Sequence, residues 1–138
     1  ANEHRDRLGV FSFWVEGIHH NLMVKLLNDH YGVQVRGGCS CAGTYGHFML
    51  KVDKNKSQSI TDKINSGNLE DKPGWVRLSI HPTMTDAELK LILKGIREII
   101  QNIDKWQKDY HFDKEAGEFF HVDIPRQKSE DFDEWFRL

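Results

Sequence analysis

Apolar residues recur at helical spacing in the stretch "HHNLMVKLLNDHYG". Leu22 pairs with Leu26 and Met23 with Leu27, each four residues apart, and Gly32 follows as a C-terminal stop. The pattern predicts an amphipathic helix of about three turns. Its apolar side should face a core.

A second helical pattern is longer and starts at a capping signal. Thr85 and Glu88 form the capping box that begins many helices. Apolar residues then recur on one side of the predicted helix, at Leu89, Ile92, Leu93, Ile96, Ile99, Ile100, Ile103 and Trp106. We expect a long helix over roughly 85–108 that covers the core.

Three other stretches have the composition of strands. The run "LGVFSFWVE" over 8–16 is dense in Val, Phe and Trp and predicts a largely buried strand, and "VQVR" over 33–36 predicts a short one. In "GWVRLSIHP" over 74–82, apolar and other residues alternate, so one face is buried and Arg77 lies on the other. The residues expected on the buried face are Val76, Leu78 and Ile80.

The order of these elements predicts an α+β fold with two layers. We expect a small, mostly antiparallel sheet of about three strands with helices packed on one face. The segment 49–74 should hold a short helix within a long excursion, and "YHFDKEAGEFFHVDI" should form a hairpin that turns at 115–117. The 138 residues are expected to form a single domain with a tail at 1–7, a core at 8–108 and a hairpin and tail at 109–138.

Composition and charge narrow the range of functions. The chain is 38% hydrophobic and 11% aromatic, which suits a packed core. Its 19 basic and 21 acidic residues give a net charge of −2, so we expect neither nucleic acid nor an anionic membrane as a partner. No apolar run is long enough to span a membrane, and the stretch "ANEHRDRLGV" lacks the apolar core of a signal peptide, which favours a cytoplasmic location.

Both cysteines lie in the glycine-rich loop "VRGGCSCAGTYGHF". Cys39 and Cys41 supply at most two ligands and His47 a third, so we expect no metal site. The single residue between the cysteines also disfavours a disulfide. Arg36 nearby would favour a thiolate, and two interpretations stay open, a reactive thiol or a structural turn.

Arg77 is the strongest binding candidate outside that loop. A guanidinium on the outer face of a strand is well suited to bind a carboxylate with two hydrogen bonds. The alternative is an ordinary surface salt bridge. The residues alone do not separate these interpretations.

Taken together, "HHNLMVKLLNDHYGVQVRGGCSCAGTYGHFML" and "KPGWVRLSIHPTMTDAEL" resemble the C-terminal small domain of class V aminotransferases, which include cysteine desulfurases. The resemblance runs from about Leu8 to Ile103. It implies that Arg77 and Arg36 bind substrate, and that Cys41 is a candidate persulfide carrier. It also implies that an active-site loop contains Gly37, Gly38, Cys39 and Ser40.

The resemblance also implies a cofactor and partners. Enzymes of this family hold pyridoxal phosphate through a lysine that follows a Ser-His pair in a preceding large domain. These 138 residues contain no such pair. We therefore expect a C-terminal fragment that binds no cofactor and is inactive by itself. The parent would be a homodimer that acts on an amino acid, by desulfuration, transamination or lyase chemistry.

A competing hypothesis is a stand-alone, non-catalytic binding domain on the same scaffold. Its partner surface would be formed by the aromatic residues of the predicted hairpin and of the tail "FDEWFRL". The same residues could instead close the core of this domain.

Overall fold

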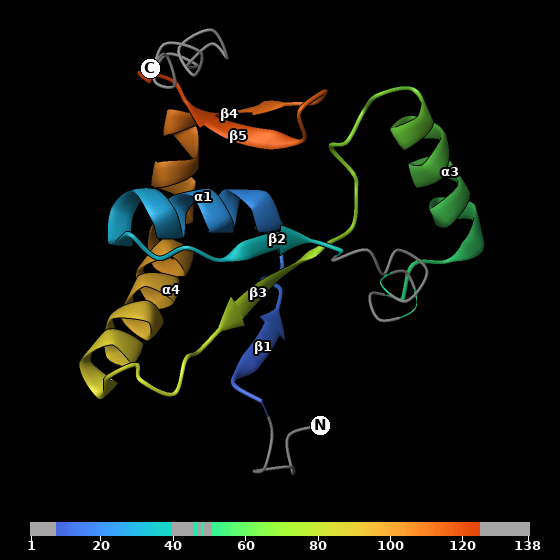
Figure 1. Ribbon diagram of the computed structural model, residues 1–138. Helices are drawn as coiled ribbons and strands as arrows, with labels where there is room; N and C mark the ends of the chain where they lie inside the picture. Colours follow the sequence, from blue (N-terminus) through green and yellow to red (C-terminus); the bar gives the residue numbers. More distant parts are fainter. Residues whose placement is uncertain (1–7, 40–45, 47, 49–50, 125–138) are drawn as a thin grey trace, which may run out of the picture.

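A three-stranded antiparallel sheet forms the centre of the protein. The computed structural model describes residues 8–39, 46, 48 and 51–124. The strands are β1 (Val10–Phe13), β2 (Arg36–Gly38) and β3 (Trp75–Ser79), in the spatial order β1-β3-β2. Central β3 pairs with both neighbours, although β2 and β3 are separated by a long excursion in the sequence (Figure 1).

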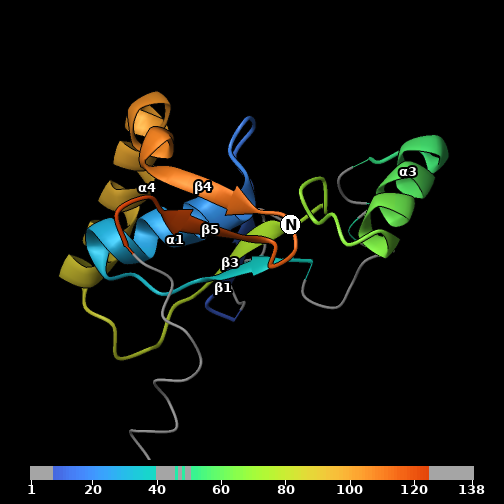
Figure 2. The ribbon, with the colours of Figure 1, turned by 90° about the horizontal axis from the view of Figure 1, so that it is seen from above.

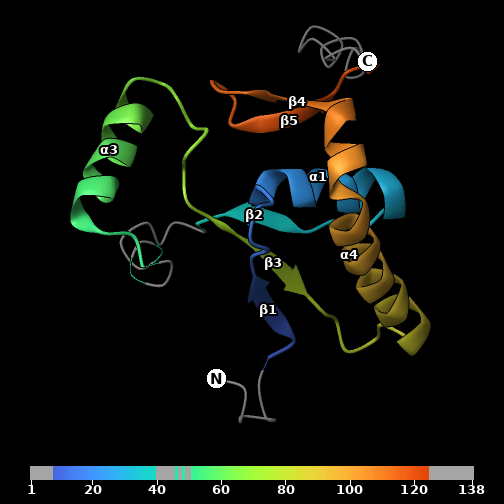
Figure 3. The same ribbon diagram turned by 180° about the vertical axis from the view of Figure 1, so that it is seen from behind.

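Two helices, α1 (His20–Tyr31) and α4 (Asp86–Trp106), pack against this sheet. They cross each other in Figure 3, and both contribute to the core beneath β3. The buried cluster comprises Leu22, Met23, Leu26, Leu27, Val76, Ile99 and Tyr110. The predicted α+β fold with helices on an antiparallel sheet is therefore confirmed.

The local signals for the two helices also match the structure. At the start of α4 the hydroxyl of Thr85 accepts from the backbone N–H of Glu88, and the Glu88 carboxylate accepts from the Thr85 N–H. At the end of α1, Gly32 adopts a left-handed conformation with φ 64°, and its N–H donates to the carbonyl of Asn28. Glycine tolerates this conformation at little cost.

The prediction of a largely buried first strand is wrong. Val10 and Phe11 are 38% and 40% exposed, and in β1 only Phe13 packs against the core. The reason is position: β1 is an edge strand, and it starts well away from α1 (Figure 1). The second strand also differs, because it spans Arg36–Gly38 rather than residues 33–36.

A two-stranded hairpin, β4 (Tyr110–Asp113) and β5 (Glu118–His121), follows α4 through the short 3₁₀ helix η1 (Gln107–Asp109). It lies over α1 in Figure 2. Tyr110 is 8% exposed and its hydroxyl donates to Asp29 Oδ2 at 2.9 Å. Phe119 packs against the same core. The predicted hairpin is therefore confirmed, and it closes the core on the far side of α1.

The excursion before β3 contains α3 (Lys54–Asn65), as expected for a short helix in this segment. Figure 1 shows α3 to one side of the sheet. The chain after it returns to the hairpin, where the N–H of Leu69 donates to the carbonyl of Lys114 at 3.0 Å. Lys114 Nζ also lies 2.7 Å from Glu70 Oε2. These contacts hold the connection before β3 against the turn of the hairpin.

None of the helices of the described residues is both long and apolar enough to cross a membrane.

Candidate functional site

Two arginines lie directly opposite each other on the outer face of the sheet. Arg36 of β2 is in register with Arg77 of β3. Val76 and Leu78, which alternate with Arg77, are 1% and 6% exposed beneath the helices. Arg77 therefore lies on the other face, as the sequence predicted, and Arg36 shares it.

This pairing concentrates positive charge. The Cβ atoms of directly opposite residues are about 5 Å apart, and like charges in such a pair repel. Among the ion pairs of the described residues, none involves Arg36 or Arg77. Nε of Arg77 is buried and has no hydrogen-bond partner in the described part of the chain. An anion between the two guanidinium groups would reduce their repulsion and would give Nε of Arg77 a hydrogen-bond partner. Each guanidinium offers a planar set of donors for this purpose.

A shallow cleft of about 270 Å³ lies at this pair. Its lining residues are Gln34, Val35, Arg36, Arg77 and Ser79. We name it the arginine cleft. None of the five is acidic, so the cleft is suited to bind a carboxylate.

The glycines after Arg36 are required by close packing and by backbone conformation. A Cβ atom on Gly37 would clash with Oδ1 of Asn21 in α1, and Gly38 has φ 106°. Side chains at either position would move β2 away from α1 or strain its backbone. The glycines thus hold the edge strand, and Arg36 with it, close to α1.

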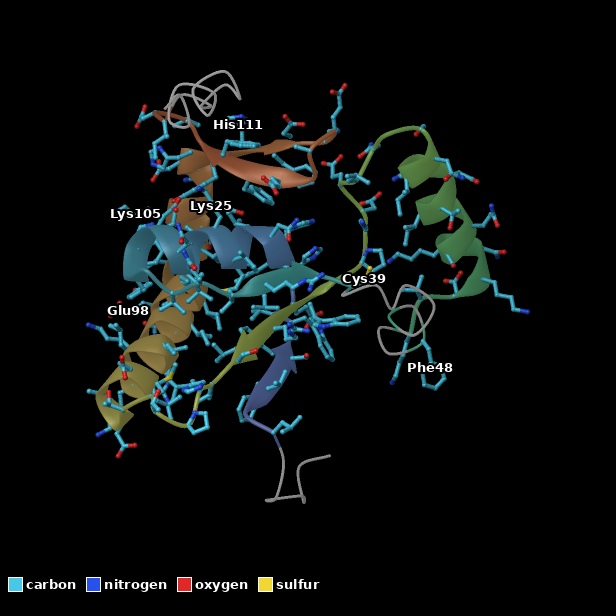
Figure 4. All side chains as sticks on the ribbon, viewed as in Figure 1. Lys25, Cys39, Phe48, Glu98, Lys105 and His111 are labelled. Carbon is cyan, nitrogen blue, oxygen red and sulfur yellow. The ribbon has the colours of Figure 1, made fainter. Side chains whose placement is uncertain are left out.

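Cys39 follows directly and is half-buried, with a free thiol. In Figure 4 it lies at the end of β2, beside the connection that leads from α3 to β3. Ser40 and Cys41, predicted to complete the loop, lie outside the described residues. The structure thus describes Arg36, Gly37, Gly38, Cys39 and Arg77 of the predicted site.

A second cleft, which the sequence did not predict, lies on the other side of Arg36. It has a volume of about 360 Å³ and is formed by four separate segments: the start of α1, the end of β2, the connection before β3 and the turn of the hairpin. We name it the histidine cleft. The residues that line it are His19, His20, Asn21, Arg36, Gly37, Gly38, Cys39, Leu69, Lys72, Ala116, Gly117 and Glu118.

The two histidines have different roles in this cleft. His19 caps α1, because its Nδ1 accepts from the N–H of Asn21 at 3.1 Å, and its ring stacks on that of His20 at a centroid distance of 4.3 Å. His20 is 9% exposed. The two rings thus cap and pack at the start of α1. Nothing in the sequence indicated that the pair faces Lys72, which is distant along the chain.

Burial makes both imidazoles weaker bases. It lowers the pKa of His19, against the opposing effect of Glu70. The pKa of His20 falls to about 4, first through burial and then through the charges of His19 and Lys72. Both rings are therefore largely neutral at pH 7.

We predict that protonation of His20 destabilises the fold. Its pKa is lower in the folded state than the ordinary 6.5, so the unfolded chain binds the proton more readily. The free energy of unfolding should be highest above about pH 6.5 and should fall toward pH 4. The expected loss is about 2 kcal/mol once solvent screening is allowed for. Urea unfolding at pH 7, 5 and 4 would measure this. His20→Gln should have a flatter pH dependence, and equal profiles for both proteins would contradict the prediction.

No group of three or more His, Cys, Asp or Glu residues within the described ranges is placed to hold a metal ion. The titratable groups of the histidine cleft are two neutral imidazoles, a thiol, two cations and one carboxylate, from Glu118. Such a set supplies mainly hydrogen-bond donors.

Comparison with known proteins identifies a family for this chain. The family model described as aminotransferase class-V matches residues 1–92, which is two thirds of the chain and includes β1, α1, β2, α3, β3 and the start of α4. No curated protein and no solved structure matches the chain.

Proposed function

Because this chain belongs to the class V aminotransferase family, we propose that it is the substrate-binding, C-terminal domain of a pyridoxal-phosphate enzyme. Family membership implies pyridoxal phosphate, an N-terminal domain that binds it and a substrate in the parent enzyme. We propose that the substrate is an amino acid and that its α-carboxylate binds between Arg36 and Arg77. The observation that carries this proposal is their direct pairing in the arginine cleft.

We propose that the described residues hold no site for the phosphate of the cofactor. A phosphate group is commonly bound by free N–H groups at a helix start. Here α1, α3 and α4 are capped by their own side chains, from His19, Asp53 and Thr85 with Glu88. Two of these caps bring a carboxylate, which repels phosphate. We therefore propose that the cofactor and its lysine belong to the N-terminal domain, and that this chain alone is inactive.

The finer details of the proposal depend on the resemblance to cysteine desulfurases. In that branch Cys41 would carry sulfur as a persulfide, with Cys39 and Ser40 in the same loop. We also propose a homodimeric parent with a cytoplasmic location. The spacing from Arg36 through Gly38 to Cys41 supports the desulfurase-like branch. Alkylation of the parent protein followed by adduct mapping would test Cys41, since an unreactive thiol in an active enzyme would exclude the role.

The competing hypothesis of a stand-alone binding domain relied on the aromatic residues of the hairpin. In the structure, Tyr110 is part of the buried core and Phe119 packs against it. These side chains close the domain rather than form an open surface. The tail "FDEWFRL" lies outside the described residues.

We predict that Arg77→Gln weakens carboxylate binding at least tenfold. A charged, two-pronged contact contributes about 1.5 to 3 kcal/mol, and glutamine keeps the polarity but removes the charge. In the full-length enzyme, kcat/KM for its amino acid should fall by at least this factor, mainly through a higher KM. In the chain alone, an NMR titration with propionate measures the same loss. Arg97→Gln, an exposed charge on α4, is the matched control. Unchanged KM and propionate affinity would refute the role of Arg77.

A further inference from the structure

The arginine cleft and the histidine cleft share one residue. Arg36 lines both, while Arg77 lines the first and Lys72 the second. The two clefts therefore adjoin at a single guanidinium group. A monocarboxylic amino acid would use the arginine cleft for its α-carboxylate and would leave the second cleft without an ionic partner.

The histidine cleft has an excess of positive charge and of donors. Arg36 and Lys72 contribute two cations, and Glu118 is the one carboxylate that lines it. Lys72, like Arg36, forms none of the ion pairs found among the described residues. Because positive charges in a concave site attract anions, the balance of groups favours a second anionic group of a ligand.

The histidine pair adds a buried polar atom that lacks a partner. Nε2 of His19 is buried and has no hydrogen-bond partner in the described part of the chain. Because Nδ1 of the same ring accepts from the N–H of Asn21, this Nε2 carries the proton of the neutral imidazole and is a free donor. The ring of His20, which stacks on it, is 9% exposed. A Cβ atom on Gly74 would lie 2.7 Å from Cε1 and Nε2 of His20, so the imidazole fills the space that glycine leaves. Buried polar groups usually have a hydrogen-bond partner, and the histidine cleft is the open side on which a ligand would supply it.

We propose that the histidine cleft binds the side-chain carboxylate of a dicarboxylic amino acid, while the arginine cleft holds its α-carboxylate. This inference rests on the proposed function and narrows the substrate class from amino acids in general to acidic ones. Lys72 and Arg36 supply charge to the side-chain carboxylate, Nε2 of His19 supplies a hydrogen bond, and His20 lies beside them.

Binding at this site should be coupled to protonation of His20. The charged and titratable groups that face His20 are His19 on its own helix, Arg36 and Cys39 at the end of β2, Lys72 in the connection before β3 and Glu118 in the hairpin. A carboxylate placed among them would favour the imidazolium form. Ligand affinity should therefore rise as the pH falls from 7 toward 5, for dicarboxylates more than for monocarboxylates.

The test is an NMR titration of the 138-residue chain with succinate, propionate and inorganic phosphate. Succinate should bind at least tenfold more tightly than propionate and should raise the pKa of His20. Lys72→Gln should reduce the affinity for succinate to about that for propionate and leave propionate binding unchanged. Lys90→Gln, an exposed charge on α4, should change neither affinity.

The variants separate the two proposals. Arg77→Gln should weaken the binding of succinate and of propionate alike. If it weakens the binding of neither, the proposed function fails. Equal affinities for succinate and propionate, or an unchanged succinate affinity in Lys72→Gln, would overturn the inference but leave the carboxylate site at Arg77 intact. Phosphate binding that depends on Lys72 but not on Arg77 and exceeds succinate binding would also overturn it, because the cleft would then be an independent phosphate site.

Discussion

Replacement of Leu26 by alanine is expected to lower the free energy of unfolding by about 3 to 4 kcal/mol. Leu26 is 0% exposed and belongs to the buried cluster to which α1, β3, α4 and the hairpin contribute. Removal of its side-chain carbons loses their transfer free energy and leaves a cavity in this cluster. Such a site collapses poorly, so the cost should lie in the upper half of the range usual for this substitution.

Urea unfolding followed by tryptophan fluorescence would measure the loss. Leu93→Ala on α4 is the matched control, because Leu93 is 45% exposed and its truncation should cost less than about 1 kcal/mol. A similar effect of both substitutions would show that the core is not centred on α1.

Gly74→Ala is the second substitution with a large expected effect. It should lower the free energy of unfolding by about 2 to 3 kcal/mol. The added methyl group would lie 2.7 Å from the His20 ring and 2.8 Å from Cα of Gly38. The contact with Gly38 is with backbone, so no change of rotamer relieves it. Either β2 separates from the chain before β3 or His20 leaves its position beneath them.

Thermal or urea unfolding of Gly74→Ala gives the size of the effect, and a double-mutant cycle with His20→Ala gives its cause. Because His20 is part of the clash, the double variant should be more stable than the sum of the single effects predicts, by about 1 kcal/mol. A fully additive cycle would place the clash elsewhere. A Gly74→Ala protein as stable as the parent chain would show that this close approach does not exist.

The same substitution should also change ligand binding in the histidine cleft. If His20 moves, Gly74→Ala should weaken succinate binding more than propionate binding. If β2 separates instead, both should weaken, because Arg36 then moves away from Arg77. Gly74 is therefore a positioning residue, and its effect on ligands should be smaller than that of Lys72→Gln.

Local pattern was sufficient for much of the fold. The spacing of Leu22, Met23, Leu26 and Leu27 identified the buried side of α1, and the capping box at Thr85 located the start of α4. The alternation around Arg77 gave the two faces of β3. These features depend on residues within a few positions of one another, so the sequence contains their cause directly.

The burial of β1 shows where local pattern was insufficient. A run of Val, Phe and Trp has the same composition in an edge strand as in a central strand. The difference depends on which strand lies beside it, and β3, its partner, comes much later in the chain. The one-sided pairing leaves Val10 and Phe11 more than a third exposed.

The sequence by itself determined the helices and the outward position of Arg77. Only the tertiary structure placed Arg36 opposite Arg77 and brought His20, Lys72 and the hairpin turn into one cleft. The physical reason is that strand register and packing between distant segments depend on the whole core, and a long excursion with α3 separates β2 from β3. Local periodicity specifies which side of each element is buried, whereas packing decides which polar residues become neighbours.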